Sequence, residues 1–271
     1  MHESGQDTAS FRLVCSPWCA ALPFERFTPV LMLPFDPESP EGDVTFYSVM
    51  DDMAIDLRLP EVRGKVVCGA SHGWLALMDE AASVTLLNPF TGGTVELPPA
   101  DKNVALASFK TVAKVDGGGW VLRYTSGAAK PIQLNNMRDI FFREIVLSAP
   151  PANSGGVDCK AMAVLANSAE IAFCRPGDTA WTLIDAKLEC PVTSVVYCQD
   201  RFVAIGFLGE ISIFSSNADD AAPLTASPLL LLPPPAHIHQ RSYLHVNGQL
   251  HLVGAILRVL DGTWYETGLQ V

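Results

Sequence analysis

GKVVCGASHGWLALMDEAASVTLLNPFTGGTVELPP, residues 64–99, is the stretch that decides the fold of this chain. Its apolar segments are short, and Asn88-Pro89 and Thr91-Gly92-Gly93 separate them with residues typical of turns. The stretch also contains Gly69-Ala70-Ser71-His72-Gly73, which matches the nucleophile elbow of serine hydrolases. The choice lies between one blade of an all-β propeller and a strand–turn–helix that carries a catalytic serine.

Short apolar segments continue through the rest of the chain, and Gly, Pro, Asn, Asp or Ser interrupts most of them. Strands at spacings near ten residues are typical of a sandwich, barrel or propeller. The strands predicted besides those of residues 64–99 cover residues 44–49, 109–115, 119–124, 140–147, 162–165, 170–174, 181–184, 195–198, 202–207, 210–214, 243–246, 249–253 and 257–260.

A repeat favours the propeller among these all-β folds. GWLALMDEAASVTLLNP, RFVAIGFLGEISIFSSN and GQLHLVGAILRVLDG each read as an apolar strand, a short turn and a second apolar strand. Trp74 and Phe202 are 128 positions apart, and Phe202 and Leu250 are 48 apart. Three steps of about 43 residues and one of 48 suit the ~40–50-residue blade of a propeller. Residues 44–271 then hold about five four-stranded antiparallel blades, within the usual range of ~4–8.

Three regions depart from this rhythm. Residues 10–22 predict a short helix, because Ser10 can cap it and Phe11, Val14 and Trp18 share a face. Residues 23–43 are rich in proline and predict a loop, with a short strand at VLMLPF. Residues 216–240 combine Ala, Asp and three consecutive prolines, and they predict an inserted loop between blades.

Composition excludes several functional classes. The net charge of −11, with no run of Lys or Arg, argues against binding to nucleic acid. The polar N-terminus has no apolar signal-peptide core, and the longest apolar stretches are too short to span a bilayer. Seven cysteines without a Cys-x-x-Cys motif suggest reduced thiols. We therefore expect a cytoplasmic or nuclear protein without membrane contact.

The serine-hydrolase alternative requires partners for Ser71. The candidate acids are Asp185 and Asp200, and the candidate histidines are His237, His239, His245 and His251. An α/β-hydrolase also needs several strand–helix–strand crossovers with long helices, and the sequence predicts almost none. The absence of these helices favours the propeller, in which Gly69 and Gly73 bracket a turn between strands.

No pattern predicts a metal or a cofactor. His237-x-His239 offers two nitrogens without a third ligand nearby, and the acidic residues are dispersed as in turns. No P-loop and no dinucleotide fingerprint is present. The tryptophans Trp74, Trp120, Trp181 and Trp264 fall about one per blade and are interpreted as core. We therefore assign no catalytic, cofactor-binding or metal-binding residue.

The ordered motifs resemble one known family. Gly69-x-Ser71-x-Gly73-Trp74-Leu75, followed by residues 86–92 (LLNPFTG) and Leu97-Pro98, resembles the plant F-box-associated family with a KIB-type β-propeller. Residues 195–214 and 242–250 are similar to later segments of that family. Phe11-Arg12-Leu13-Val14-Cys15 with Trp18 resembles the last helix of an F-box, from which Pro17 departs.

The resemblance implies a domain organisation and a function. Residues 1–29 are expected to be a remnant of the F-box with a linker, and residues 30–271 a partial propeller, so that the chain is shortened at both ends. Full-length members are taken to be substrate receptors of ubiquitin ligases. A non-catalytic protein-interaction module is therefore expected, with an unknown protein partner and without docking of the Skp-type adaptor. The alternatives left open are the hydrolase and a truncated product without retained activity.

Overall fold

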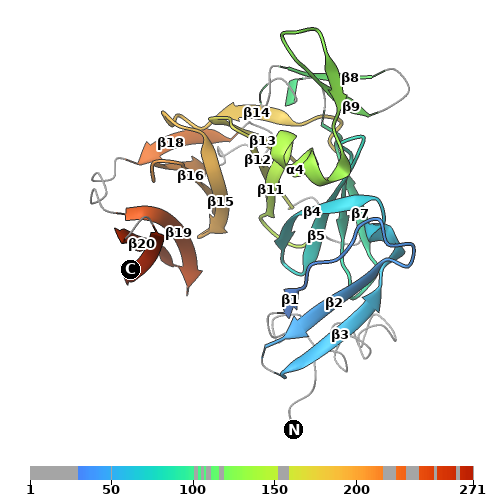
Figure 1. Cartoon of the computed structure of the whole chain (residues 1–271), viewed down its shortest axis with the longest axis horizontal. Coiled ribbons are helices and arrows are strands. Elements are labelled where there is room, and N and C mark those ends of the chain that lie inside the picture. The colour runs from blue at the N-terminus through green and yellow to red at the C-terminus, as the bar shows by residue number, and fades with distance from the viewer. Residues whose placement is uncertain are drawn as a thin grey trace.

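The computed structural model describes residues 30–49, 51–100, 103–104, 107, 111–115, 119–151, 159–215, 224–229, 238–246, 249–260 and 263–270. Over these residues the chain consists mainly of antiparallel strands, arranged in separate small sheets (Figure 1). The helical elements with described bounds are short: η2 Pro60–Val62, η3 Leu134–Asn136 and α4 Met137–Ile140. None of the described helices is long and apolar enough to cross a membrane.

Three of the sheets have four strands that pair in the order of the sequence. They contain β4 Lys65–Ser71, β5 Trp74–Asp79, β6 Val84–Leu87 and β7 Thr94–Leu97; β11 Phe142–Leu147, β12 Ala161–Leu165, β13 Glu170–Cys174 and β14 Thr182–Asp185; and β15 Val192–Cys198, β16 Arg201–Gly206, β17 Ile211–Ser215 and β18 Thr225–Leu229. Four antiparallel strands in sequential order are the architecture of a propeller blade. The predicted fold class is confirmed.

The other three sheets have three strands each among the described residues. They contain β1 Val30–Met32, β2 Asp43–Ser48 and β3 Met53–Arg58; β8 Val112–Lys114, β9 Trp120–Arg123 and β10 Ala129–Pro131; and β19 Ile238–Val246, β20 Gln249–Leu260 and β21 Thr263–Gln270. In β2 every second residue is buried, which is the alternation expected of a strand with one covered face.

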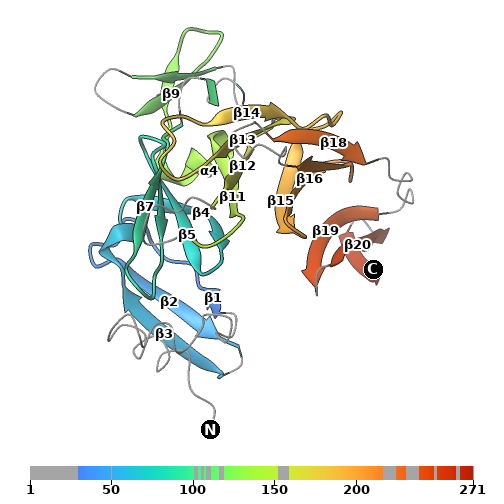
Figure 2. The ribbon, with the colours of Figure 1, turned by 180° about the vertical axis from the view of Figure 1, so that it is seen from behind.

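The sheets follow one another along an open arc, from the β1–β3 sheet to the β19–β21 sheet (Figure 1). Along this arc β4 contacts β11, and β11 and β12 both contact β15. The β8–β10 sheet projects outward from the arc, as the opposite view confirms (Figure 2). Since β4 and β11 meet directly, the residues between them include one sheet that is not part of the arc.

The core is divided among the interfaces between successive sheets. One cluster joins Val44 and Phe46 of β2 to Leu75 and Leu77 of β5. A second cluster contains Trp74, Ala76 and Met78 of β5 with Phe142 and Ile145 of β11, and a third joins Met162 and Val164 of β12 to Phe202 and Ala204 of β16. Alternate residues of β5 therefore face opposite neighbours. Burial on both faces explains why β5 and β12 are continuously apolar rather than alternating.

The repeat inferred from the sequence is located correctly and its steps are nearly even, but the third hairpin, expected within GQLHLVGAILRVLDG, is instead one continuous strand, β20. Trp74, Phe202 and Leu250 all lie in the second strand of their sheets, β5, β16 and β20. The 128 positions from Trp74 to Phe202 were expected to contain three steps of about 43 residues. The second strands of the two intervening sheets, β9 and β12, begin at Trp120 and Ala161, so the steps are 46, 41 and 41 residues. The β8–β10 sheet thus occupies the place of a blade in the sequence, although it projects outward from the arc (Figure 1).

Four strands were not predicted: β3, β10, β18 and β21. Within residues 216–240, which were predicted to be a loop, β18 pairs with β17 and β19 begins at Ile238. Pro228 lies opposite Ser212 on the outer strand of its sheet, a position where a missing N–H is tolerated. The helix predicted over residues 10–22 lies outside the described residues.

Candidate functional site

Ser71 is the last residue of β4, and the structure around it is strand–turn–strand. His72 and Gly73 make the two-residue turn into β5 with φ values of 52° and 76°, as in the type I′ turns of β-hairpins. The Ser71 hydroxyl oxygen accepts a hydrogen bond of 3.2 Å from the backbone N–H of Leu147 in β11. The structural premise of the hydrolase alternative, a serine between a strand and a helix, is therefore wrong. The turn predicted between Gly69 and Gly73 is shorter, because β4 continues through Ser71.

Gly69 lies at the same contact, between the β4–β7 sheet and the β11–β14 sheet. A Cβ atom on Gly69 would lie 2.1 Å from the carbonyl oxygen of Ile145, which is less than any real contact distance. The residue is thus glycine because β4 and β11 approach each other too closely for a side chain. Together Gly69 and Ser71 join two sheets, and Gly73 supplies the positive φ of the turn.

The acids proposed as partners of Ser71 have other roles. Asp185 accepts hydrogen bonds from the side chain of Lys187 (2.6 Å) and from its backbone N–H (2.8 Å), and these bonds lower the pKa of the carboxyl. Asp200 lies in the turn between β15 and β16 with a φ of 58°. His237 lies outside the described residues, as do the side chains of His239, His245 and His251.

We predict that Ser71→Ala lowers the free energy of unfolding by only about 1 kcal/mol, because it removes one partly buried hydrogen bond. Urea unfolding followed by tryptophan fluorescence measures this change. A fluorophosphonate probe is expected to label neither the wild type nor the variant. Labelling of the wild type that disappears in Ser71→Ala would contradict the structural role.

The described cysteines are unsuited to nucleophilic chemistry. Cys68, Cys159, Cys174, Cys190 and Cys198 are free thiols. Burial raises the pKa of Cys68 to about 12 and that of Cys159 to about 11, and it also raises the pKa of Cys174. A thiol that stays protonated is a poor nucleophile. Within the described ranges, no group of three or more His, Cys, Asp or Glu residues is placed to hold a metal ion.

The tryptophans that the structure describes are structural, as predicted. Trp74, Trp120 and Trp181 are all buried. The indole N–H of Trp120 donates to the carbonyl of Ala81, and that of Trp181 donates to the carbonyl of Pro98. The side chain of Trp264 lies outside the described residues. The aromatic groups therefore hold the sheets together and are not a ligand-stacking platform.

Backbone hydrogen bonds join the turns after β1, β5, β12 and β16 to the connections between successive sheets. We call these turns and connections the connection rim, defined by residues 33–42, 59–64, 80–83, 98–100, 166–169, 186–191 and 207–210. Gly64 donates to Pro37 and Ala100 donates to Ala82, each at 2.8 Å, and Phe207 donates to Pro191 at 2.9 Å. Each of these turns is therefore fixed to a neighbouring connection.

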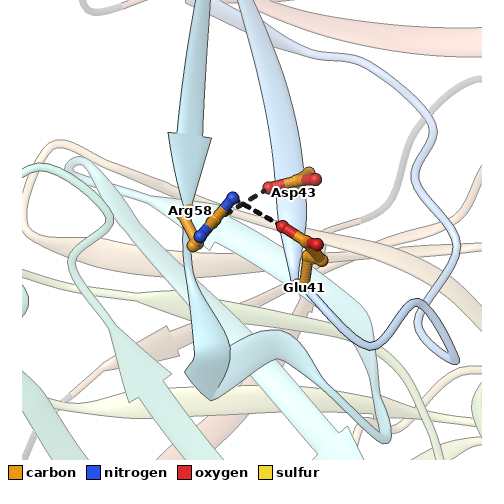
Figure 3. Close-up of polar contacts among 3 residues, drawn as sticks. All are labelled: Glu41, Asp43 and Arg58. Atoms are coloured by element: carbon orange, nitrogen blue, oxygen red, sulfur yellow. Dashed lines mark hydrogen bonds and ion pairs between the residues drawn. The ribbon is translucent and has the colours of Figure 1, made fainter.

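The connection rim is acidic. Its only basic residues are Arg63 and Lys187, and its acidic residues are Asp36, Glu38, Glu41, Glu61, Glu80, Glu189 and Glu210. Arg58 lies beside the rim and reaches Glu41 and Asp43, with 3.6 Å between its Nε and the Asp43 carboxylate (Figure 3). These groups are well exposed, so the ion pairs contribute little to stability. Their effect is to reduce the negative charge at this end of the arc.

The connection rim also carries the most exposed large apolar side chain among the described residues. Phe207 is 71% exposed and its neighbour Leu208 is 55% exposed, both in the turn between β16 and β17. This exposed turn was not predicted, because the apolar character of Phe207 placed it at the end of a predicted strand, residues 202–207. The spacing Gly206-Phe207-Leu208-Gly209 was the available signal, since two glycines around two residues indicate a tight hairpin turn.

Comparisons with known proteins give one family. The family model described as KIB1-4 beta-propeller matches residues 46–268. No curated protein matches the chain. Among solved structures, it is similar to YCF48 from Cyanidioschyzon merolae, with 10% identity over 84% of this chain and 67% of that chain and a TM-score of 0.39. It is also similar to BBS1N in complex with ARL6DN, with 14% identity, coverage of 84% and 74%, and a TM-score of 0.35.

Proposed function

Because this chain belongs to the KIB1-4 beta-propeller family, we propose that it is a non-catalytic protein-interaction module, similar to the substrate-binding propeller of a plant F-box ubiquitin-ligase receptor. The match over residues 46–268 carries this proposal, because propellers of this family are typically associated with F-box proteins. The protein would act in the cytoplasm or nucleus by presenting turns on one side of the arc to a protein partner.

The geometry supports a binding role in two ways. The residues that matched a catalytic motif, Gly69 and Ser71, are used in the contact between β4 and β11. The connection rim, in contrast, combines acidic side chains with an exposed apolar turn at Phe207. Protein-binding surfaces typically have an apolar centre and a polar surround.

Binding to a ligase adaptor would involve a different part of the chain from binding to a substrate protein. Residues 1–29, in which only Phe11-Arg12-Leu13-Val14-Cys15 and Trp18 resemble an F-box and Pro17 departs from its pattern, are not expected to bind a Skp-type adaptor. The domain division at residue 29 is part of this proposal.

A fusion experiment tests the proposed function. Proteins that bind the tagged chain in plant cells are identified, produced separately and titrated against the purified chain. We expect saturable binding of a defined protein. We also expect that a complete F-box joined ahead of residue 1 directs ubiquitination of that protein in a reconstituted ligase, whereas the unfused chain does not. Absence of any saturable partner would contradict the interaction role, and ubiquitination by the unfused chain would contradict the adaptor argument.

A further inference from the structure

The turn between β16 and β17 presents two large apolar side chains where turns normally have small or polar residues. The Gly209 N–H donates to the carbonyl of Gly206 (2.9 Å), and the Gly206 N–H donates to that of Glu210 (2.8 Å). Phe207 and Leu208 are thus the two central residues, and Gly209 follows with a φ of 87°. Central turn positions favour Pro, Asn, Asp, Gly and Ser. Neither apolar side chain is needed to form this turn.

The equivalent turns of the neighbouring sheets lack such groups. The turn between β5 and β6 is Glu80-Ala81-Ala82-Ser83, and that between β12 and β13 is Ala166-Asn167-Ser168-Ala169. Both are also engaged within the molecule: the carbonyl of Ala81 accepts from Trp120, and that of Ser168 accepts from Val192. The exposed apolar pair is therefore particular to the β16–β17 turn and is not a general feature of the repeat.

Hydrogen bonds hold the β16–β17 turn against residues 186–191, the connection that leads into β15. The Phe207 N–H donates to the Pro191 carbonyl at 2.9 Å, and the Leu208 N–H donates to the Cys190 sulfur at 3.4 Å. The Cys190 thiol in turn donates to the Glu210 carboxylate at 2.8 Å. A Cβ on Gly206 would lie 2.7 Å from that sulfur, so the close fit requires glycine. A turn fixed in this way loses little conformational entropy when it binds.

The charges around the turn indicate the chemistry of a partner. Glu189 is exposed and Glu210 is partly exposed, and both belong to the segments that form the turn and its support. The nearby Lys187 is already paired with Asp185 at 2.6 Å. An apolar projection with acidic neighbours complements an apolar pocket bordered by basic side chains.

We propose that the Phe207–Leu208 turn is the docking element of this module, and that it inserts into an apolar pocket bordered by Lys or Arg on a protein partner. The inference rests on the proposed function and specifies where the partner binds. Phe207 supplies the buried anchor, and the acidic residues Glu189 and Glu210 orient the approach. The negative net charge of the chain, −11, favours association with the same class of partner.

Site-specific photo-cross-linking tests the docking site in the full chain. A benzophenone amino acid replaces Phe207 in one variant and Leu31, which is 55% exposed at the first sheet of the arc, in the control. We expect a discrete cross-linked protein from position 207 and not from position 31. The protein identified in this way is then produced and titrated against unlabelled wild type, Phe207→Ser, Glu189→Lys and Leu31→Ser. Capture alone does not support the proposal.

Support requires that Phe207→Ser weakens binding by about 30-fold or more, as expected for a buried anchor. Glu189→Lys should weaken it and reduce its dependence on salt, while Leu31→Ser should leave it unchanged. Thermal melting shows that each variant is folded. Cross-linking at position 31 alone, equal binding by Phe207→Ser, or cross-linking to a second copy of this chain overturns the docking site but not the interaction role. No cross-linked protein at either position overturns both proposals.

Discussion

Trp181→Ala is expected to lower the free energy of unfolding by about 3–5 kcal/mol, as large-to-small changes of buried tryptophan do. The side chain is only 6% exposed, and its ring lies 4.8 Å from that of Phe142. Its indole N–H donates to the carbonyl of Pro98 at 2.6 Å, just after β7. The residue therefore joins the β11–β14 sheet to the end of the β4–β7 sheet, and its loss leaves both a cavity and an unsatisfied carbonyl.

Urea unfolding followed by circular dichroism measures this change. Trp181→Phe retains a ring against Phe142 but loses the bond to Pro98 and part of the indole volume, so a loss of about 1–3 kcal/mol, smaller than that of Trp181→Ala, is expected. Tyr124→Ala, which removes an aromatic side chain that is 51% exposed, is the matched control and should have little effect. A loss below about 1 kcal/mol for Trp181→Ala would show that this sheet contact does not stabilise the fold.

Gly69→Ala is expected to lower the free energy of unfolding by about 3 kcal/mol, the upper part of the usual range for overpacking. The added Cβ would meet the backbone oxygen of Ile145 at 2.1 Å, and a backbone atom cannot move aside as a flexible side chain can. β4 and β11 would have to separate, which also lengthens the bond from Leu147 to Ser71.

Denaturant titration of Gly69→Ala beside Ala70→Ser checks this expectation. Ala70 is the next residue of β4 and is exposed, so its substitution tests the strand without adding an atom between the two sheets. Equal stabilities of the two variants would mean that the β4–β11 approach can relax without cost. Gly69→Ala must also lower the free energy of unfolding by more than Ser71→Ala does, because the Ser71 hydroxyl contributes only one hydrogen bond.

Local sequence patterns predict most of the strands. β6 is apolar from Val84 to Leu87, and β13 has the bounds that the sequence predicts, residues 170–174. β3 was missed although MAIDLR has the alternation of a strand with one covered face, in which Ile55 is buried, Leu57 is half-buried, and Asp56 and Arg58 are exposed. β18 was missed because it contains Pro228 and lies at the outer edge of its sheet, where burial provides no pattern. Strands in the middle of the arc are predictable because both of their faces are covered.

Contacts between distant residues could not be predicted from the sequence. Gly69 and Ser71 fit a catalytic elbow and a strand equally well, and the deciding partner, Leu147, is 76 positions away. The β8–β10 sheet has the strand pattern of a blade, and only the direct contact of β4 with β11 places it outside the arc. The exposure of Phe207 likewise depends on the hydrogen bonds that fix the turn, because its apolar character alone indicates a buried strand.

Neighbouring residues of β5 face opposite sides of the strand and pack into different clusters. Leu77 and Met78 are adjacent in the sequence, yet they belong to different clusters, one toward β2 and one toward β11. Their contributions to stability are therefore expected to add, whereas Met78 shares a cluster with Ile145 and can couple to it. We therefore expect the molecule to behave as a series of nearest-neighbour junctions, in which a defect at one junction leaves the intrinsic stability of the others unchanged.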